Sequence, residues 1–126
     1  MRLLLDTNVL VRFVEGRLSG QLSDSISSPE AEVHISVATL WEIAIKVRLG
    51  KLPLRLSLAD LPLLIDSVGF TLLTIQALHV LALPDPEPAT RDPFDRLLLA
   101  QCMTEGLRLV TLDRTLASHP LSWESV

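Results

Sequence analysis

The sequence predicts an α/β fold: a three-layer α/β/α sandwich with a central parallel sheet. Three observations lead to this prediction. Short apolar runs alternate with stretches of helical periodicity along the whole chain, a pattern typical of a parallel sheet covered on both faces. The length of 126 residues suits a single hydrophobic core. No internal repeat or change in composition divides the chain, so we expect one domain over residues 1–126.

The first apolar run, Leu3 to Leu5, predicts a buried parallel strand. Asp6 follows it directly, and helical spacing of apolar residues begins at Val9 and continues to Val14. The chain therefore places a carboxylate at the carboxyl end of a strand. Ligands of open α/β sheets bind at this end, so we expect chemistry at Asp6.

The later elements follow from the same patterns and from capping residues. Ser36, Ser57 and Asp92 are suited to begin helices, and Gly50, Gly69 and Gly106 to end them. Three prolines between 84 and 88 indicate a loop. The expected strands are 33–36, 70–73 and 107–111, with a last short edge strand around Trp123 in the tail 119–126. The expected helices are a short one within 18–26, then 37–50, 58–68, 75–83 and 92–105, with a helical turn at 114–117.

Composition narrows the possible functions. No apolar run approaches the roughly 18 residues of a membrane span, and we expect no secretory signal, because no basic segment precedes a long apolar one. Cys102 is the only cysteine, which fits a reducing cytoplasm. The net charge of −4 is unlike that of a protein that holds nucleic acid by counterion release alone. Nine of the eleven cations are Arg, so a few could still contact phosphate locally.

Asp113 repeats the arrangement of Asp6, because it also follows a strand and precedes a helical turn. Each acid has an equally simple structural explanation as a helix cap. If the two strands are neighbours in one parallel sheet, however, the two carboxylates face each other at the same edge.

Three further acids lie near helix starts or faces. Glu42 lies at the margin of a predicted apolar arc, and a solvated ion pair with Lys46 is the simpler explanation. Asp92 is fully explained as an N-cap before Pro93, whereas Asp95 is also free to project into a cleft. The predicted arc comprises Val37, Leu40, Trp41, Ala44, Ile45 and Arg48.

Several carboxylates in one cleft raise each other's pKa or require a cation. Oxygen ligands without His or Cys favour Mg²⁺ or Mn²⁺. His34, His79 and His119 lack ligand spacing and are expected in the core or on the surface. Such a site suits metal-activated water that attacks a phosphodiester.

Four segments resemble the PIN-domain ribonucleases, specifically VapC-type toxins of type II toxin–antitoxin systems. The segments are Leu4-Leu5-Asp6-Thr7-Asn8, the run from Ser36 to Lys46 with Leu40-Trp41-Glu42, the phrase Arg91-Asp92-Pro93-Phe94-Asp95-Arg96-Leu97-Leu98-Leu99-Ala100-Gln101, and Leu109-Val110-Thr111-Leu112-Asp113. They occur in the family order and spacing and span nearly the whole chain. The resemblance implies a compact parallel sheet with its first and fourth strands adjacent.

The resemblance also assigns roles. Asp6 and Asp95 would be the principal ligands of Mg²⁺ or Mn²⁺, Asp113 a direct or water-mediated ligand, and Glu42 the fourth acid. Thr7, Asn8 and Thr111 would support these acids, and Arg96 would contact substrate or shape the site. The implied substrate is RNA. The implied partners are a second copy of the chain and an antitoxin whose basic residue enters the acidic cleft. Apolar helices could supply a groove for a partner helix, but burial in the protein's own core explains each of their leucines at least as well: Leu18, Leu22, Leu58, Leu61 and Leu64.

Two alternative functions remain open at this point. A receiver-like signalling module would have a similar length and alternation, but it carries paired acids after its first strand and a Lys after its last. A PIN domain that binds RNA or protein without cutting is the other alternative, and the intact acids argue against it.

Overall fold

The computed structural model describes residues 1–124. The four strands among them are β1 (Arg2–Leu5), β2 (Glu32–Ser36), β3 (Thr71–Leu73) and β4 (Arg108–Val110). The helices are α1 (Thr7–Val14), α2 (Gly20–Ser27), α3 (Val37–Arg48), α4 (Leu61–Ser67), α5 (Ala77–Leu81), α6 (Pro93–Glu105) and α7 (Arg114–Ala117), with a 3₁₀ turn η1 at Leu58–Asp60. Every helix and strand expected before the C-terminal tail is present, and most of their ends differ from the prediction by a few residues.

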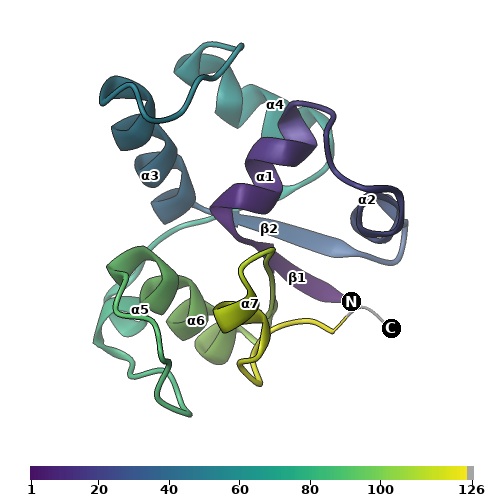
Figure 1. The fold of residues 1–126 in the computed structure, drawn as a ribbon. Helices are drawn as coiled ribbons and strands as arrows, with labels where there is room; N and C mark the ends of the chain where they lie inside the picture. Colours follow the sequence, from purple (N-terminus) through teal and green to yellow (C-terminus); the bar gives the residue numbers. More distant parts are fainter. Residues whose placement is uncertain (125–126) are drawn as a thin grey trace.

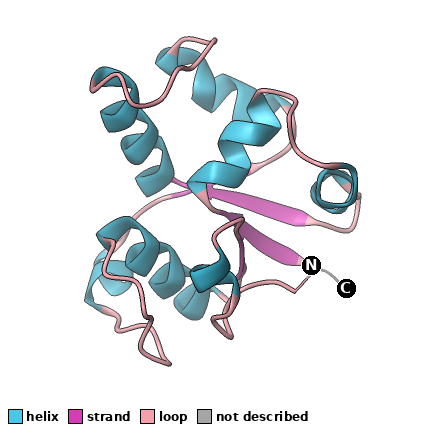
Figure 2. Cartoon of the chain, in the orientation of Figure 1, coloured by secondary structure: helices cyan, strands magenta, loops and turns pink. Residues whose placement is uncertain are grey.

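The strands form one parallel sheet in the order β3-β2-β1-β4. Helices α1 to α4 lie above this sheet in Figure 1, and α5 to α7 lie below it, so the predicted three-layer sandwich is confirmed. Figure 2 shows the strands between the two groups of helices. The first and fourth strands are adjacent, with Leu4 opposite Leu109. This order differs from the 2-1-3-4-5 order of receiver-like folds.

The alternation of β1 divides the core in two. Leu3 and Leu5 face one layer of helices, where they pack with residues such as Leu10 and Ile43. Leu4 faces the other layer and packs with Leu99 of α6. Successive side chains of a strand point to opposite faces, so one run of three leucines fills both cores. All three are fully buried.

Some elements are shorter than the sequence predicted, and capping residues account for two of these differences. The helix expected over 75–83 is only α5, because Gln76 begins it through a capping box with His79. Helix α3 stops at Arg48, and Gly50 then adopts a φ of 71°. The expected edge strand near Trp123 is reduced to a single parallel bridge between Leu109 and Ser122. Residues 125 and 126 of the predicted tail lie outside the described part.

The leucines considered as a partner groove pack within the protein itself. Leu61 is buried in the core, and Leu18, Leu22 and Leu58 pack against the same cluster. This packing agrees with the alternative explanation of these leucines, burial in the protein's own core, although Leu18, Leu22 and Leu58 are only partly buried. Among the described residues, several large exposed apolar side chains lie on and beside α5, at Leu78, Val80, Leu81 and Leu83, and others, such as Leu63 and Leu49, lie elsewhere.

Candidate active site

Asp6 lies at the junction of β1 and α1 and serves the helix and the site at once. Its Oδ1 accepts a hydrogen bond of 2.8 Å from the Thr7 backbone N–H, and its Oδ2 accepts one of 2.8 Å from Thr111 Oγ1. Only 4% of the residue is exposed. Burial raises the pKa of Asp6 above its usual value, with further contributions from the nearby charges of Glu42 and Asp113.

Glu42 is buried, which corrects its predicted place at the margin of an apolar arc. The buried face of α3 consists of Ala38, Thr39, Glu42 and Ile43, whereas Trp41 is 61% exposed. Helix α3 packs against α1, α6 and β2. The positions of these neighbours, and not the apolar periodicity of the helix, therefore determine which of its faces is buried. The arc made of Val37, Leu40, Trp41, Ala44, Ile45 and Arg48 was therefore wrong as the buried face.

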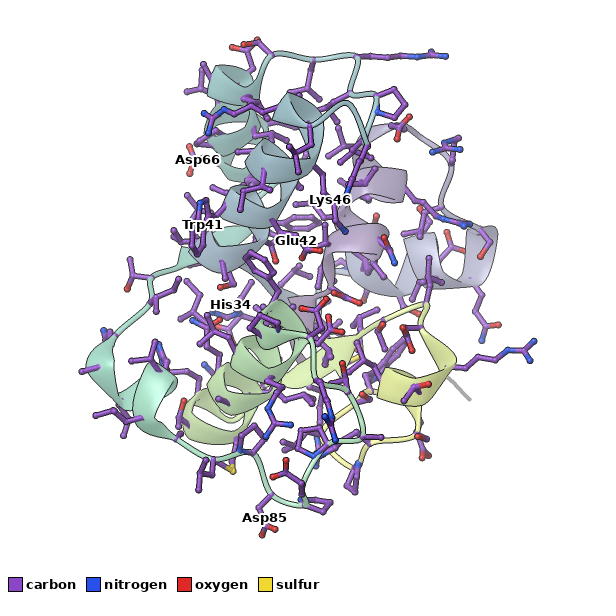
Figure 3. All side chains as sticks on the ribbon, turned by 60° about the vertical axis from the view of Figure 1, so that its left-hand side comes forward. His34, Trp41, Glu42, Lys46, Asp66 and Asp85 are labelled. Atoms are coloured by element: carbon purple, nitrogen blue, oxygen red, sulfur yellow. The ribbon has the colours of Figure 1, made fainter. Side chains whose placement is uncertain are left out.

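Both carboxylate oxygens of Glu42 are engaged. Thr7 Oγ1 donates a 2.6 Å hydrogen bond to Oε1, and Lys46 Nζ lies 2.7 Å from Oε2. The predicted pair of Glu42 with Lys46 is confirmed, but only its lysine is solvated: the Lys46 side chain is 42% exposed and the Glu42 side chain 10%. In Figure 3, Lys46 and Trp41 lie on opposite sides of Glu42.

Asp92 and Asp95 begin α6. Asp92 Oδ1 accepts hydrogen bonds from the backbone N–H groups of Phe94 (2.8 Å) and Asp95 (3.3 Å), which confirms Asp92 as the N-cap. Asp95 Oδ2 accepts a 3.2 Å bond from Thr90 Oγ1. Burial raises the pKa of Asp95 to about 7, and the charges of Asp6, Asp92 and Glu42 add to this effect.

Asp113 follows β4 and begins α7. Its Oδ1 accepts hydrogen bonds from the N–H groups of Thr115 (2.8 Å) and Leu116 (3.2 Å). Its own N–H donates to Thr111 Oγ1 at 3.0 Å, the same hydroxyl that donates to Asp6. Thr111 therefore links the two acids across neighbouring strands. Asp113 is exposed, unlike Asp6.

The acids of four separate segments thus share one electrostatic environment. Asp6 raises the pKa of Asp95, Asp113 raises that of Asp6, and Glu42 raises both. Lys46 is the cation that this environment holds: its pKa is raised, first by its hydrogen bond to Glu42 and further by the charges of Asp92 and Asp6. One ammonium group leaves most of the negative charge of this edge uncompensated.

The donor set fits a hard divalent cation, because it consists of carboxylate oxygens with threonine hydroxyls behind them. Within residues 1–124, no three carboxylate, imidazole or thiol side chains are gathered tightly enough to form a ready-made ligand group. The acids are therefore close enough to perturb one another's pKa but are engaged with hydroxyl, amide and ammonium groups.

The other predicted residues separate into two groups. Thr7 and Thr111 contact the acids, as expected. Asn8 does not contact them in any interaction of the described residues, and lines a neighbouring hollow. Arg96 pairs with Glu87 at 2.6 Å and donates to the Thr90 carbonyl at 3.0 Å, so it braces the loop before α6.

Sequence reasoning missed Thr90. Its hydroxyl donates to Asp95 and also accepts a 3.2 Å bond from the Asp92 backbone N–H. A threonine two residues before a helix cap was the available signal, since such hydroxyls commonly hold turns. It also missed the edge-to-face contact of Trp41 and Phe94, whose ring centroids are 5.6 Å apart and which joins α3 to α6.

The three histidines are buried, in agreement with their predicted structural role. His79 Nε2 lies 2.9 Å from a Glu105 oxygen, and His119 Nε2 lies 2.7 Å from the Pro86 carbonyl. His34 Nδ1 has no hydrogen-bond partner among residues 1–124.

Comparison with protein families agrees with this geometry. The family model described as PIN domain matches residues 3–120. The chain belongs to the PIN domain family, whose members are in general metal-dependent nucleases and generally bind RNA. A search of curated proteins found no match.

Proposed function

We propose that this chain is a metal-dependent endoribonuclease of the VapC type, which cleaves RNA phosphodiester bonds and is inhibited by a cognate antitoxin. One observation carries the proposal. Asp6, Glu42, Asp95 and Asp113 come from four separate segments, and burial, with the added charges of Asp6, Asp92 and Glu42, raises the pKa of Asp95 to about 7. Clustered, perturbed carboxylates are characteristic of functional sites.

In this proposal, Asp6 and Asp95 are the principal ligands of Mg²⁺ or Mn²⁺. Asp113 is a direct or water-mediated ligand, and Glu42 is the fourth acid. We call Asp6, Glu42, Asp95 and Asp113 together the acidic group. A bound divalent ion would supply an activated water and polarise the phosphodiester. The match between an oxygen-only donor set and hard cations supports the assignment.

The protein's own groups prepare this site. Thr111 and the Thr7 N–H hold the two Asp6 oxygens in fixed directions. Lys46 pairs with Glu42 at 2.7 Å and offsets part of the negative charge of the site. Thr90 fixes one oxygen of Asp95. Such outer partners set the orientation of metal ligands.

The nuclease proposal is tested with the purified full chain and a fluorescent single-stranded RNA. We expect cleavage with Mg²⁺ or Mn²⁺ and none with EDTA, and a loss of 100-fold or more in Asp95→Asn. Asp66→Asn is the matched control, because Asp66 is an exposed aspartate of α4 outside the acidic group, as Figure 3 shows. RNA binding without cleavage in both ions would instead support the non-catalytic alternative.

The toxin role, the antitoxin, a homodimer and a cytoplasmic location belong to the same proposal. The uncompensated negative charge at the acids supports an inhibitor that inserts an arginine there. The exposed apolar side chains on and beside α5 support a dimer surface. None of the helices in residues 1–124 has the length and hydropathy of a transmembrane span.

The toxin proposal has its own test. Induced expression of the chain is expected to stop cell growth, and Asp95→Asn to relieve the arrest. Co-expression of a short adjacent reading frame with an Arg-containing tail should restore growth of cells that carry the parent. Light scattering of the purified chain measures the dimer. If cells grow normally while they express a chain that cleaves RNA in vitro, the toxin role is rejected and the nuclease proposal stands.

A further inference from the structure

We propose that a basic hollow beside the acidic group binds the phosphodiester backbone of RNA next to the bond that is cut. We define the basic hollow by its four cationic side chains, Arg12, Arg17, Lys46 and Lys51. This inference rests on the proposed function, because it names how the same site would hold its substrate.

The basic hollow is continuous with the acidic group. It has a volume of about 500 Å³, and Thr7 and Asp113 form part of its lining. Thr7 also donates to Glu42, and Asp113 shares the Thr111 hydroxyl with Asp6. A chain bound in the hollow would therefore reach the acids without crossing another element.

The charges of the hollow are only half compensated. Lys46 is paired with Glu42 at 2.7 Å and Arg17 with Glu15 at 3.1 Å. Arg12 and Lys51 have no ion pair or side-chain hydrogen bond with any of residues 1–124, and both are exposed. The hollow therefore gathers four cationic side chains, two of them without a partner in the described part of the chain, in a protein of net charge −4.

Backbone hydrogen bonds join each free cation of the hollow to one of its paired cations. Arg12 lies in the last turn of α1, and its carbonyl accepts a 2.8 Å bond from the Arg17 N–H. Lys51 follows α3, and its N–H donates a 2.9 Å bond to the Lys46 carbonyl. Each free cation is thus tied by a tight turn to one of the paired cations.

A polyanion with regularly spaced charges fits this arrangement best. The acids would repel bare RNA, so cations are needed on the approach, and Arg and Lys are the usual phosphate contacts. An acidic protein segment would satisfy the cations but would gain nothing from a lining shared with a nuclease site. The observations therefore favour RNA.

Binding measured in EDTA separates this inference from the nuclease proposal, because it needs no catalysis. The probe is a fluorescent 12-nucleotide RNA, followed by anisotropy at several salt concentrations. We expect the double variant Arg12→Gln/Lys51→Gln to bind about tenfold more weakly. The slope of log affinity against log salt should fall by about 1.4, at about 0.7 for each lost phosphate contact.

The matched control is Arg48→Gln/Arg55→Gln, which removes two exposed cations that do not line the hollow. It should leave the salt slope unchanged. Equal slopes for parent and hollow variant would overturn the inference even if the chain cleaves RNA. A chain that never cleaves but shows the altered slope would reject the nuclease proposal and retain the hollow. Tighter binding of a poly-aspartate peptide than of RNA would also overturn it.

Discussion

At the scale of single residues, threonine hydroxyls determine how the acids are presented. Thr7 serves Asp6 through its backbone and Glu42 through its side chain, and Thr111 serves Asp6 and Asp113. A hydroxyl donates to a carboxylate without adding charge. The arrangement therefore orients the acids and lowers the desolvation cost of each, but it leaves their mutual repulsion in place.

Asp95 makes the stability of the metal-free protein depend on pH. In the folded state it keeps its proton up to about pH 7, whereas the unfolded chain releases it near pH 4. Between these values the folded state holds more protons, so the free energy of unfolding falls as the pH rises and stays lower above pH 7.

Asp95→Asn is therefore expected to stabilise the metal-free protein at pH 8 but not at pH 4. After allowance for the solvent screening of a half-buried carboxylate, we expect about 1–2 kcal/mol, or about 5 °C in Tm. Thermal unfolding in EDTA at both pH values measures this. A variant less stable than the parent at pH 8 would contradict the burial of charge at Asp95.

Thr111→Val should weaken metal binding without removing a ligand. The change deletes the hydroxyl that donates to Asp6, and the loss of such a partner typically costs 10- to 100-fold in metal affinity. Calorimetric titration with Mn²⁺ provides the measurement. Thr104→Val is the control, because that hydroxyl bonds only to carbonyls of α6, at Ala100 and Gln101. Equal affinities for the two variants would show that Thr111 has no positioning role.

At the scale of elements, the site lies where helices begin. Asp6, Asp92 and Asp113 cap α1, α6 and α7, and Ser36 caps α3. The N-terminal ends of helices carry partial positive charge, so these starts offset part of the repulsion among the acids. The same residues that begin the helices therefore help the sheet edge to tolerate its negative charge.

The C-terminal end of α6 gives a test of element boundaries. Gly106 has a φ of 69°, where an alanine is strained, and an added Cβ would lie 3.4 Å from Arg2 Nη1. Gly106→Ala should cost about 1 kcal/mol in urea unfolding. Gly20→Ala, in the first turn of α2 with open space around it, should be neutral or stabilising. Equal effects would mean that the cap is not under conformational constraint.

At the scale of the whole molecule, one sheet joins two cores. Leu3 and Leu5 lie in the core under α1 to α4, and Leu4 in the core with α6. Because β1 contributes to both, neither core can be lost without removing the central strand. We therefore expect residues 1–126 to unfold as one domain.

The two tryptophans test this cooperativity. Trp41 is an exposed side chain of α3, and Trp123 packs on the core near the tail. In the single-tryptophan variants Trp41→Phe and Trp123→Phe, urea unfolding followed by fluorescence should agree with far-UV circular dichroism of the same variant. Different midpoints for fluorescence and circular dichroism would show separately unfolding parts.

The fold was largely predictable, because its signals are local. Apolar runs gave the strands, and residues such as Ser36 and Asp92 marked helix starts. The inward face of α3 was not predictable, because Trp41 and Glu42 are neighbours in sequence but helix packing chose the charged one for burial. The edge strand expected near Trp123 was also wrong, because only one bridge, between Leu109 and Ser122, joins this tail to the sheet.

The sequence by itself determined which acids follow strands and begin helices, because caps and strand ends depend on neighbouring residues. Only the tertiary structure decided that these acids share one environment, that Thr90 holds Asp95, and that Arg12 and Lys51 lie beside them without partners. The physical reason is that the charge felt by a side chain depends on distance in space. Strand order, which placed β4 next to β1, sets that distance.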